Sequence, residues 1–168
     1  TCTAPSKTFN LPGLQISNIF ISNENLRRLF IKELRKTGYS QPNLMGMVAF
    51  RAAYEKGAEW LDQLIRYLAG NLKLTRDFIN AEMPEIQLVE PEGTYLVWLD
   101  FSKFGLSDRE IEKILVSKAK LWLSSGPAFG AGGQGFQRFN IACPRSVLQQ
   151  GLNRLKEAFS HYIQTPAQ

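Results

Sequence analysis

Hydrophobic residues recur at helical spacing over much of the first half of the chain, and they predict three helices. The first begins at Ser22 or Asn23, whose side chains can cap a helix, and ends near Gly38, which tolerates a left-handed backbone. The second covers residues 44–56, where many small apolar residues predict tight packing in a core. The third covers residues 58–83 and would be roughly 39 Å long. That length exceeds a small domain and predicts a helix that bridges two domains.

Residues 14–22 carry apolar side chains on both faces of an extended chain, which is the pattern of an interior strand. No other strand is predicted before Ile86, and a lone strand is not stable in water. We therefore interpret residues 1–83 as the remnant of a larger domain, and the whole chain as the C-terminal part of a larger protein.

The pattern changes after Pro84 to short strands separated by helices. Two of these helices begin with a capping-box sequence, one at Ser107 and one at Ser146. The predicted strands cover residues 86–90, 94–101, 121–123 and 136–142. This order predicts a small α+β domain over residues 84–168, in which helices lie on a largely antiparallel sheet.

Lys7 lies between two hydroxyl residues in the sequence Ala-Pro-Ser-Lys-Thr-Phe-Asn at positions 4–10. A lysine in such a setting can bind an aldehyde cofactor covalently, provided that its amine loses its proton near neutral pH. Phe9, Leu11 and Leu14 are expected to desolvate that amine. The alternative interpretation is a solvated loop, because lysine is rarely buried.

Arg138 lies on the predicted strand 136–142, where side chains alternate between two faces. Phe139 and Ile141 are expected to face the core, so Arg138 faces the other way. The planar guanidinium fits a carboxylate with two oxygens. The alternative is an arginine on a solvated sheet face.

Residues 126–135 form a glycine-rich segment ahead of that strand. They are not interpreted as a phosphate cradle, because a strand and not a helix follows them. We expect either a loop that moves near a substrate, with Phe129 as a lid contact, or a flexible connection.

Charge and composition narrow the function classes. The chain of 168 residues has a formal net charge of +5, but its basic residues follow the polar faces of predicted helices, so no nucleic-acid partner is expected. The single His161 and the two cysteines predict no metal site; Cys2 and Cys143 are interpreted as packing residues. No apolar run approaches the ~20 residues of a membrane span and no leader is recognised, so we expect a cytoplasmic protein without a membrane partner.

Three motifs in this order resemble the class I/II aminotransferase family, the fold-type I pyridoxal-phosphate enzymes, and in particular its carbon–sulfur β-lyase branch (cystathionine β-lyase, cystalysin). The first is Pro-Ser-Lys-Thr-Phe-Asn with Gly13-Leu14 after it. The second is Pro-Glu-Gly-Thr-Tyr at 91–95 with Trp-Leu-Asp at 98–100. The third is Arg-Phe-Asn-Ile-Ala-Cys-Pro-Arg at 138–145. The resemblance covers residues 3–159.

The resemblance implies an α/β fold: the C-terminal part of a PLP-dependent transferase (aspartate aminotransferase-like) fold, with a large-domain remnant at 1–83 and an α+β small domain at 84–168. It implies that Lys7 binds the cofactor pyridoxal 5'-phosphate and is the catalytic base, and that Arg138 holds the α-carboxylate of a small amino-acid substrate. The hydroxyls of Thr3, Ser6 and Thr8 are candidate cofactor contacts.

The resemblance also implies that the full-length protein is a homodimeric enzyme that cleaves cysteine thioethers, and that the fragment alone is inactive. Gln15 and Ala4 depart from the arginine and serine that many aminotransferases use to bind the cofactor phosphate. The residues that contact the cofactor ring are expected in the missing portion. An aminotransferase is the nearest alternative function, and a non-catalytic binding or assembly module is the second.

Overall fold

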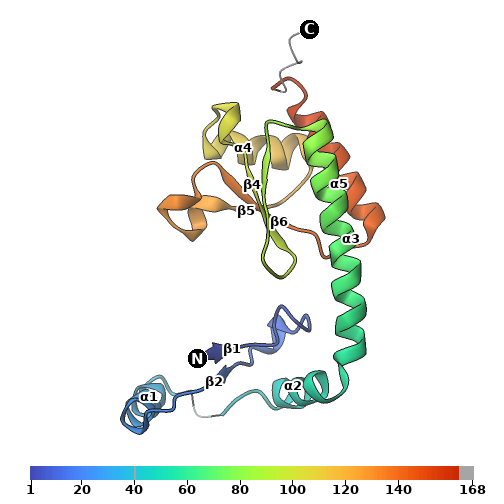
Figure 1. Ribbon diagram of the computed structural model, residues 1–168. Coiled ribbons are helices and arrows are strands. Elements are labelled where there is room, and N and C mark those ends of the chain that lie inside the picture. Colours follow the sequence, from blue (N-terminus) through green and yellow to red (C-terminus); the bar gives the residue numbers. More distant parts are fainter. Residues whose placement is uncertain (40, 163–168) are drawn as a thin grey trace. The chain divides into compact units, whose positions relative to one another are not determined.

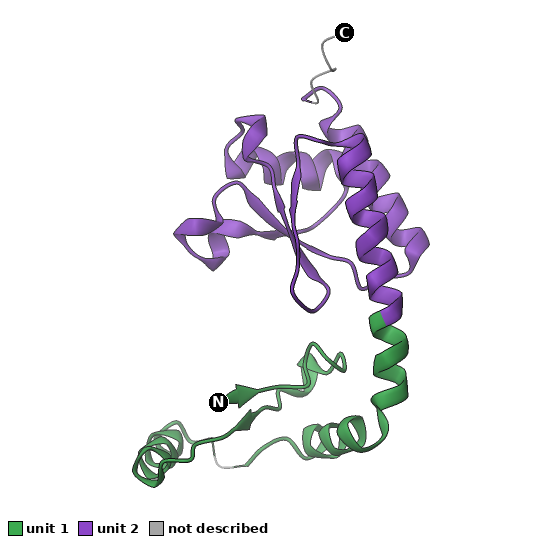
Figure 2. Cartoon of the chain, viewed as in Figure 1, with its two compact units in different colours: residues 1–65 green, residues 66–168 purple. Residues whose placement is uncertain are grey.

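The computed structural model describes residues 1–39 and 41–162. The chain divides into two compact units, Thr1–Ile65 and Arg66–Gln168, which Figure 2 shows in two colours. The division lies inside helix α3 (Ala58–Glu82), which therefore contributes residues to both units. The two units are defined by contacts within the chain, and they do not test the domain boundary predicted between residues 83 and 84. That boundary stays a prediction.

Unit 1 contains two short strands and two helices besides the start of α3 (Figure 1). The strands β1 (Cys2–Thr3) and β2 (Asn18–Ile19) pair antiparallel. They are followed by α1 (Glu24–Lys36) and α2 (Leu44–Lys56). Asn23 caps α1 by accepting a hydrogen bond from the backbone N–H of Leu26 at 3.0 Å, and Gly38 has φ +75° after the helix ends, as predicted.

The predictions for the strand and for the second helix of unit 1 are wrong. The strand expected at 14–22 shrinks to the two residues of β2, because a 3-10 turn (η1, Pro12–Leu14) and a left-handed Gln15 interrupt the extended chain. Helix α2 is not packed in a core: Gly46 is its buried residue, whereas Leu44 and Met45 are 67% and 65% exposed. The apolar composition of α2 indicates a helix that needs cover, and the described part of the chain does not supply it.

Unit 2 is built on a four-stranded antiparallel sheet of order β3-β4-β6-β5. The strands are β3 (Gln87–Val89), β4 (Leu96–Asp100), β5 (Ser124–Ser125) and β6 (Phe136–Asn140). Helices α4 (Asp108–Ile114) and α5 (Arg145–Phe159), the π-helical turn η3 (Leu115–Ala119) and the second half of α3 supply the apolar residues that pack on one face. In Figure 1, α5 runs beside that half of α3, and Lys156 forms an ion pair with Glu82.

The core of the molecule lies in unit 2. Val97 and Leu99 of β4 and Phe139 of β6 point to the helices and are buried. They pack in one cluster with Ile79 of α3 and Leu152 of α5. Alternation along β4 and β6 puts their other side chains, Arg138 among them, on the opposite face. The prediction that helices lie on an antiparallel sheet is confirmed.

Local signals in unit 2 have mixed outcomes. The capping box at Ser107 is confirmed, because Ser107 and Glu110 exchange hydrogen bonds at the start of α4. The capping box at Ser146 is wrong: α5 begins at Arg145 after Pro144, which has no side-chain cap. The strand expected at 121–123 is also wrong, since pairing with β6 begins three residues later, at Ser124.

The cysteines differ from each other. Cys143 is half-buried against the core, as predicted, and burial raises the pKa of its thiol. Cys2 is exposed, so its interpretation as a packing residue is wrong. No helix among the described residues is long and apolar enough to cross a membrane.

Candidate functional site

Lys7 lies on a short turn that connects β1 to η1, and we call residues 5–9 the lysine turn. The backbone N–H of Phe9 donates to the carbonyl of Pro5 at 2.8 Å, and the N–H of Leu11 donates to the carbonyl of Ser6 at 3.2 Å. Pro5 is buried, whereas Lys7 itself is exposed. The sequence therefore forms a closed turn whose middle residue presents its side chain outward.

The side chains expected to bury Lys7 do not do so within the described structure. The ring of Phe9 packs against Tyr54 of α2, with ring centroids 5.4 Å apart, and against Trp60 of α3, at 6.3 Å. Leu11 and Leu14 are half-buried, and Lys7 stays exposed beside them. The desolvation prediction is wrong for the chain described, because the ring of Phe9 packs on α2 and α3 and leaves Lys7 exposed.

The candidate cofactor contacts cluster around the same turn. Ser6 is half-buried and Thr8 exposed, one on each side of Lys7. Thr3 is exposed on β1, where it pairs with Asn18 of β2. Gln15 follows η1 with a left-handed backbone, φ 50° and ψ 46°, and offers no positive charge. The lysine turn thus carries one amine and two hydroxyls, and Thr3 of β1 adds a third hydroxyl outside the turn.

Arg138 lies on β6 between its cross-strand neighbours Trp98 of β4 and Ser124 of β5. Its Nη2 donates a hydrogen bond to the Oγ of Ser124 at 3.3 Å, and its Cζ lies 4.5 Å from the ring centroid of Phe129. Its Nε is buried and has no hydrogen-bond partner among the described residues. The predicted orientation of Arg138 away from the core is confirmed.

The ring that contacts the guanidinium, Phe129, belongs to an aromatic group. The ring of Trp98 meets that of Phe129 edge-on at 5.2 Å and that of Phe136 at 6.4 Å. A cation on the face of an aromatic ring is attracted by the ring's electron density, which orients the guanidinium without neutralising it. Arg138 therefore keeps its charge available for an anionic ligand.

A polar brace holds the segment that follows β6, and sequence reasoning missed it. Asn71 of α3 is fully buried; its Nδ2 donates to the carbonyl of Ile141 at 2.8 Å and to that of Cys143 at 3.0 Å. Its Oδ1 accepts from the Nε of Arg145 at 3.2 Å. Tyr67 of α3 accepts from the N–H of Arg145 at 2.8 Å. The sequence signal that could have revealed this brace is Asn71 itself, a polar residue on the apolar stripe of a helix.

The glycine-rich segment folds into two consecutive 3-10 turns, η4 (Gly126–Phe129) and η5 (Ala131–Gly133). The backbones of Gly126 and Gly133 touch so closely that a Cβ on either would overlap the other, so both must be glycine. Phe129 is 53% exposed over Arg138. Whether this segment moves over a substrate stays a prediction.

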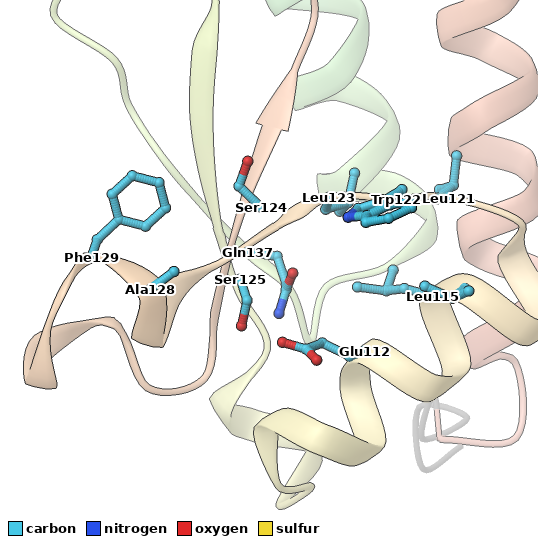
Figure 3. Close-up of a pocket in the computed structure, with 11 residues that line it drawn as sticks. Glu112, Leu115, Leu121, Trp122, Leu123, Ser124, Ser125, Ala128, Phe129 and Gln137 are labelled. Atoms are coloured by element: carbon cyan, nitrogen blue, oxygen red, sulfur yellow. The ribbon is translucent and has the colours of Figure 1, made fainter.

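A cavity of about 520 Å³ lies between β5 and the η3 turn (Figure 3). Ser124 and Phe129 line it and also contact Arg138. Gln137 enters from the other face of β6, 1% exposed, and its Nε2 has no hydrogen-bond partner in the described part of the chain. In Figure 3 the side chains of Gln137 and Glu112 point toward one another.

Among residues 1–39 and 41–162, no group of three or more metal-ligating side chains could hold a metal ion.

The predicted site residues fall into two groups. Thr3, Ser6, Lys7 and Thr8 are brought together in unit 1, whereas Arg138 belongs to unit 2. The first group offers a nucleophilic amine with hydroxyl donors, and the second offers a cation on a rigid strand. Their assigned roles remain predictions.

Known proteins resemble the chain over nearly all of its length. Cystathionine beta-lyase PatB of Bacillus subtilis (strain 168) is 43% identical over 160 residues, which cover 95% of this chain and 41% of that protein. Cystalysin from Treponema denticola, whose crystal structure contains a pyridoxal 5'-phosphate cofactor, is 38% identical with a TM-score of 0.91, over 96% of this chain and 41% of that one. The PLP-bound C-S lyase from Staphylococcus hominis is 34% identical with a TM-score of 0.83, over 94% of this chain and 40% of that one.

These matches bear on both the fold and the extent of the chain. The mixed α/β structure corresponds to part of a pyridoxal-phosphate-dependent transferase fold, which confirms the predicted fold class. The chain spans about 41% of the length of PatB. The model of the family described as aminotransferase class I and II matches residues 1–155. The chain therefore belongs to the class I and II aminotransferase family.

Proposed function

We propose that the full-length protein is a pyridoxal-phosphate-dependent carbon–sulfur β-lyase that cleaves cysteine thioethers to a thiol, ammonia and pyruvate. The observation that carries this proposal is the similarity to PatB, a cystathionine beta-lyase, over 95% of this chain. The family model matches residues 1–155, a span that contains both Lys7 and Arg138.

The lysine turn fits the aldehyde of pyridoxal 5'-phosphate. Lys7 is exposed, so its amine can be reached by a carbonyl, and Ser6 and Thr8 lie on either side of it with hydroxyl donors. Thr3 is a further candidate contact. Gln15 contributes no charge to the phosphate, so we assign the phosphate's cationic partners to the remainder of the full-length protein. When bound, the cofactor supplies a conjugated ring that stores an electron pair released at the substrate's α-carbon.

Arg138 is the proposed partner of the substrate's α-carboxylate. Ser124 and Phe129 hold its guanidinium in place, and β6 is fixed between two neighbouring strands. A rigid planar donor matches a carboxylate in both distance and direction. The arginine would therefore orient the α-carbon and its hydrogen for the reaction.

Lys7 is the proposed base. Its Nζ takes the α-proton, the bond between the β-carbon and sulfur breaks, and the electron pair of that bond leaves with sulfur, which becomes a thiol on protonation. The unsaturated amine left behind takes up water and yields pyruvate and ammonia. The products require no outside oxidant or reductant.

The test is an assay of the full-length protein with L-cystathionine or an S-alkylcysteine. We expect pyruvate and free thiol in equal amounts without an added keto acid. Activity that depends on a keto acid, with transfer of the amino group as the main outcome, would replace the lyase by an aminotransferase, the function for which the family is named. Borohydride reduction of the loaded protein followed by peptide mapping tests the assignment of Lys7, and modification of another lysine would overturn it.

The homodimer remains an expectation from the family resemblance, and the cytoplasmic location remains an expectation from the sequence analysis. Size measurement of the full-length protein tests the first, and fractionation of the source cells tests the second. We also expect the 168-residue chain alone to bind the cofactor poorly and to show no lyase activity.

A further inference from the structure

Phe9 closes the lysine turn at one end. Its N–H donates to the carbonyl of Pro5 at 2.8 Å, which ties together the residues on both sides of Lys7. Pro5 is buried, so the other end of the turn is also fixed. The direction in which Lys7 leaves the backbone thus depends on where Phe9 is held.

The side chain of Phe9 is held at the joint between α2 and α3. Its ring packs against Tyr54, near the end of α2, and Trp60, near the start of α3. Both contacts lie within the range of centroid distances at which aromatic pairs attract. The lysine turn is therefore attached to two helices through one side chain.

Gly57 makes room for this ring. It is the C-cap of α2, and its carbonyl accepts the N–H of Leu61 in the first turn of α3 at 2.9 Å. A Cβ at position 57 would overlap the carbonyl oxygen of Ala53 and would lie 2.7 Å from the Cε1 of Phe9. Glycine at the joint thus permits the close approach of the ring, which a larger residue would displace.

We propose that Phe9 is the positioning residue for Lys7, acting from the joint between α2 and α3. The inference rests on the proposed function, because it assumes that Lys7 carries the cofactor. A reacting amine must sit within a fraction of an ångström of its productive position, and misplacement by about 1 Å can cost on the order of a hundredfold in rate. Phe9 supplies that placement through a closed turn and a ring packed against two helices.

The experiment compares Phe9→Ala with Phe50→Ala in the full-length protein. Phe50 is a matched control, because it is a half-buried ring of the same cluster, 4.6 Å from Tyr54, but it lies on α2 and not on the lysine turn. Three quantities are measured: the thermal midpoint of unfolding, the pH dependence of the bound cofactor's absorbance, and the fraction of Lys7 fixed by borohydride after a set time.

We expect the two variants to lose similar thermal stability. Phe9→Ala should also move the midpoint of the absorbance titration and lower the fixed fraction of Lys7 several-fold, while Phe50→Ala leaves both at the wild-type values. Phe9→Leu, which keeps apolar volume without a ring, should fall between wild type and Phe9→Ala. If Phe9→Ala does not fold, Phe9→Leu decides the question by the same measurements.

Two failures are distinguishable. If borohydride fixes no cofactor on Lys7 of the wild-type protein, the proposed function fails. If Lys7 is fixed in the wild type but the Phe9 variants match Phe50→Ala in titration and fixation, then Phe9 is an ordinary packing residue and the positioning role is overturned.

Discussion

Unit 1 and unit 2 contain apolar residues in similar patterns but use them differently. In unit 2, apolar side chains from the sheet and from the helices form one buried cluster, and every buried residue of the hydrophobic core lies at or after Ile79. In unit 1, Pro5 and Gly46 are the buried residues among those described, while Leu29 and Met45 are 56% and 65% exposed. The hydrophobic effect therefore stabilises unit 2 within this chain, whereas unit 1 has helices whose apolar faces lack cover from the described residues.

The two halves of the proposed site are held in place by different kinds of packing. Arg138 stands on a central strand of a sheet with a core beneath it. Lys7 stands on a turn that one aromatic ring attaches to two helices. We infer that the arginine is in place in this chain alone, and that the lysine turn reaches its final stability in the full-length protein.

The largest effect is expected in amide hydrogen exchange of the 168-residue chain. Amides of β4, β6 and α5 should exchange at least about a thousandfold more slowly than those of α1 and α2, because their opening exposes the core. Mass spectrometry of peptides or NMR measures the rates. Equal protection in the two units would contradict the comparison and would mean that unit 1 is covered, for instance by association of chains.

Matched leucine substitutions test the same contrast by stability. Leu152→Ala removes a fully buried side chain of α5 and should cost about 2–5 kcal/mol. Leu29→Ala makes the same change on α1, where the side chain is 56% exposed, and should change stability by about 0.5 kcal/mol or less. Urea unfolding of the 168-residue chain measures both. A loss for Leu29→Ala as large as that for Leu152→Ala would show that unit 1 unfolds with a core of its own.

Substitution of Arg138 tests the rigid half of the site in the full-length protein. Arg138→Ala should lower kcat/KM about a hundredfold or more with unchanged cofactor content, because the substrate loses a charge-assisted contact. Arg138→Lys should recover part of the loss, since an ammonium lacks the planar fork. Arg154→Ala, an exposed arginine of α5, is the control for charge alone. Unchanged kcat/KM in Arg138→Ala would return Arg138 to the role of a solvated sheet residue.

The fold could be predicted from the sequence wherever a local pattern decides the structure. Helical spacing gave α1, α2 and α3 nearly to the residue, and alternation gave the two faces of β6. The prediction failed where the outcome depends on a partner: residues 14–22 have an apolar pattern, but only Asn18 and Ile19 pair with β1. The packing of α2 failed for the same reason, because apolar composition does not say which segment covers a helix.

The candidate site, like the fold, could be predicted where a local pattern decides the structure and not where distant elements meet. Lys7 and Arg138 could be singled out by motif, and the orientation of Arg138 by alternation. The contacts of Arg138 with Ser124 and Phe129 join different elements, and the brace at Asn71 joins residues 70 positions apart in the chain. No spacing rule encodes such contacts. The expected burial of Lys7 failed because neighbours in sequence need not be neighbours in packing.

Helix caps provide a smaller test of the comparison. Ser107→Ala removes the cap of α4 in unit 2 and should lower the stability of the cooperative transition by about 1 kcal/mol. Asn23→Ala removes the corresponding cap of α1 in unit 1 and should leave that transition unchanged, since α1 contributes nothing to the core. Urea unfolding followed by tryptophan fluorescence measures the transition. An equal loss for Asn23→Ala would mean that α1 unfolds together with unit 2.

The smallest effect concerns the acid limb of unit 2's stability. The hydroxyl of Ser107 and then its backbone N–H donate to the carboxylate of Glu110, and these hydrogen bonds lower the pKa of Glu110. A carboxyl group whose pKa is lowered by folding stabilises the native state above its unfolded pKa, about 4.3, and loses that contribution as the pH falls through the lower folded value. The wild-type chain should therefore be slightly more stable than Glu110→Gln at pH 7, and the difference should shrink as the pH falls below the unfolded pKa and through the lower folded pKa of Glu110. Urea unfolding at a series of pH values measures the difference. In a Ser107→Ala background the pH-dependent part should be reduced, because the hydrogen bond from the Ser107 hydroxyl is gone.

A difference that grows as the pH falls would have the wrong sign for a carboxylate that accepts hydrogen bonds in the folded state. That result would show that the capping box does not stabilise α4.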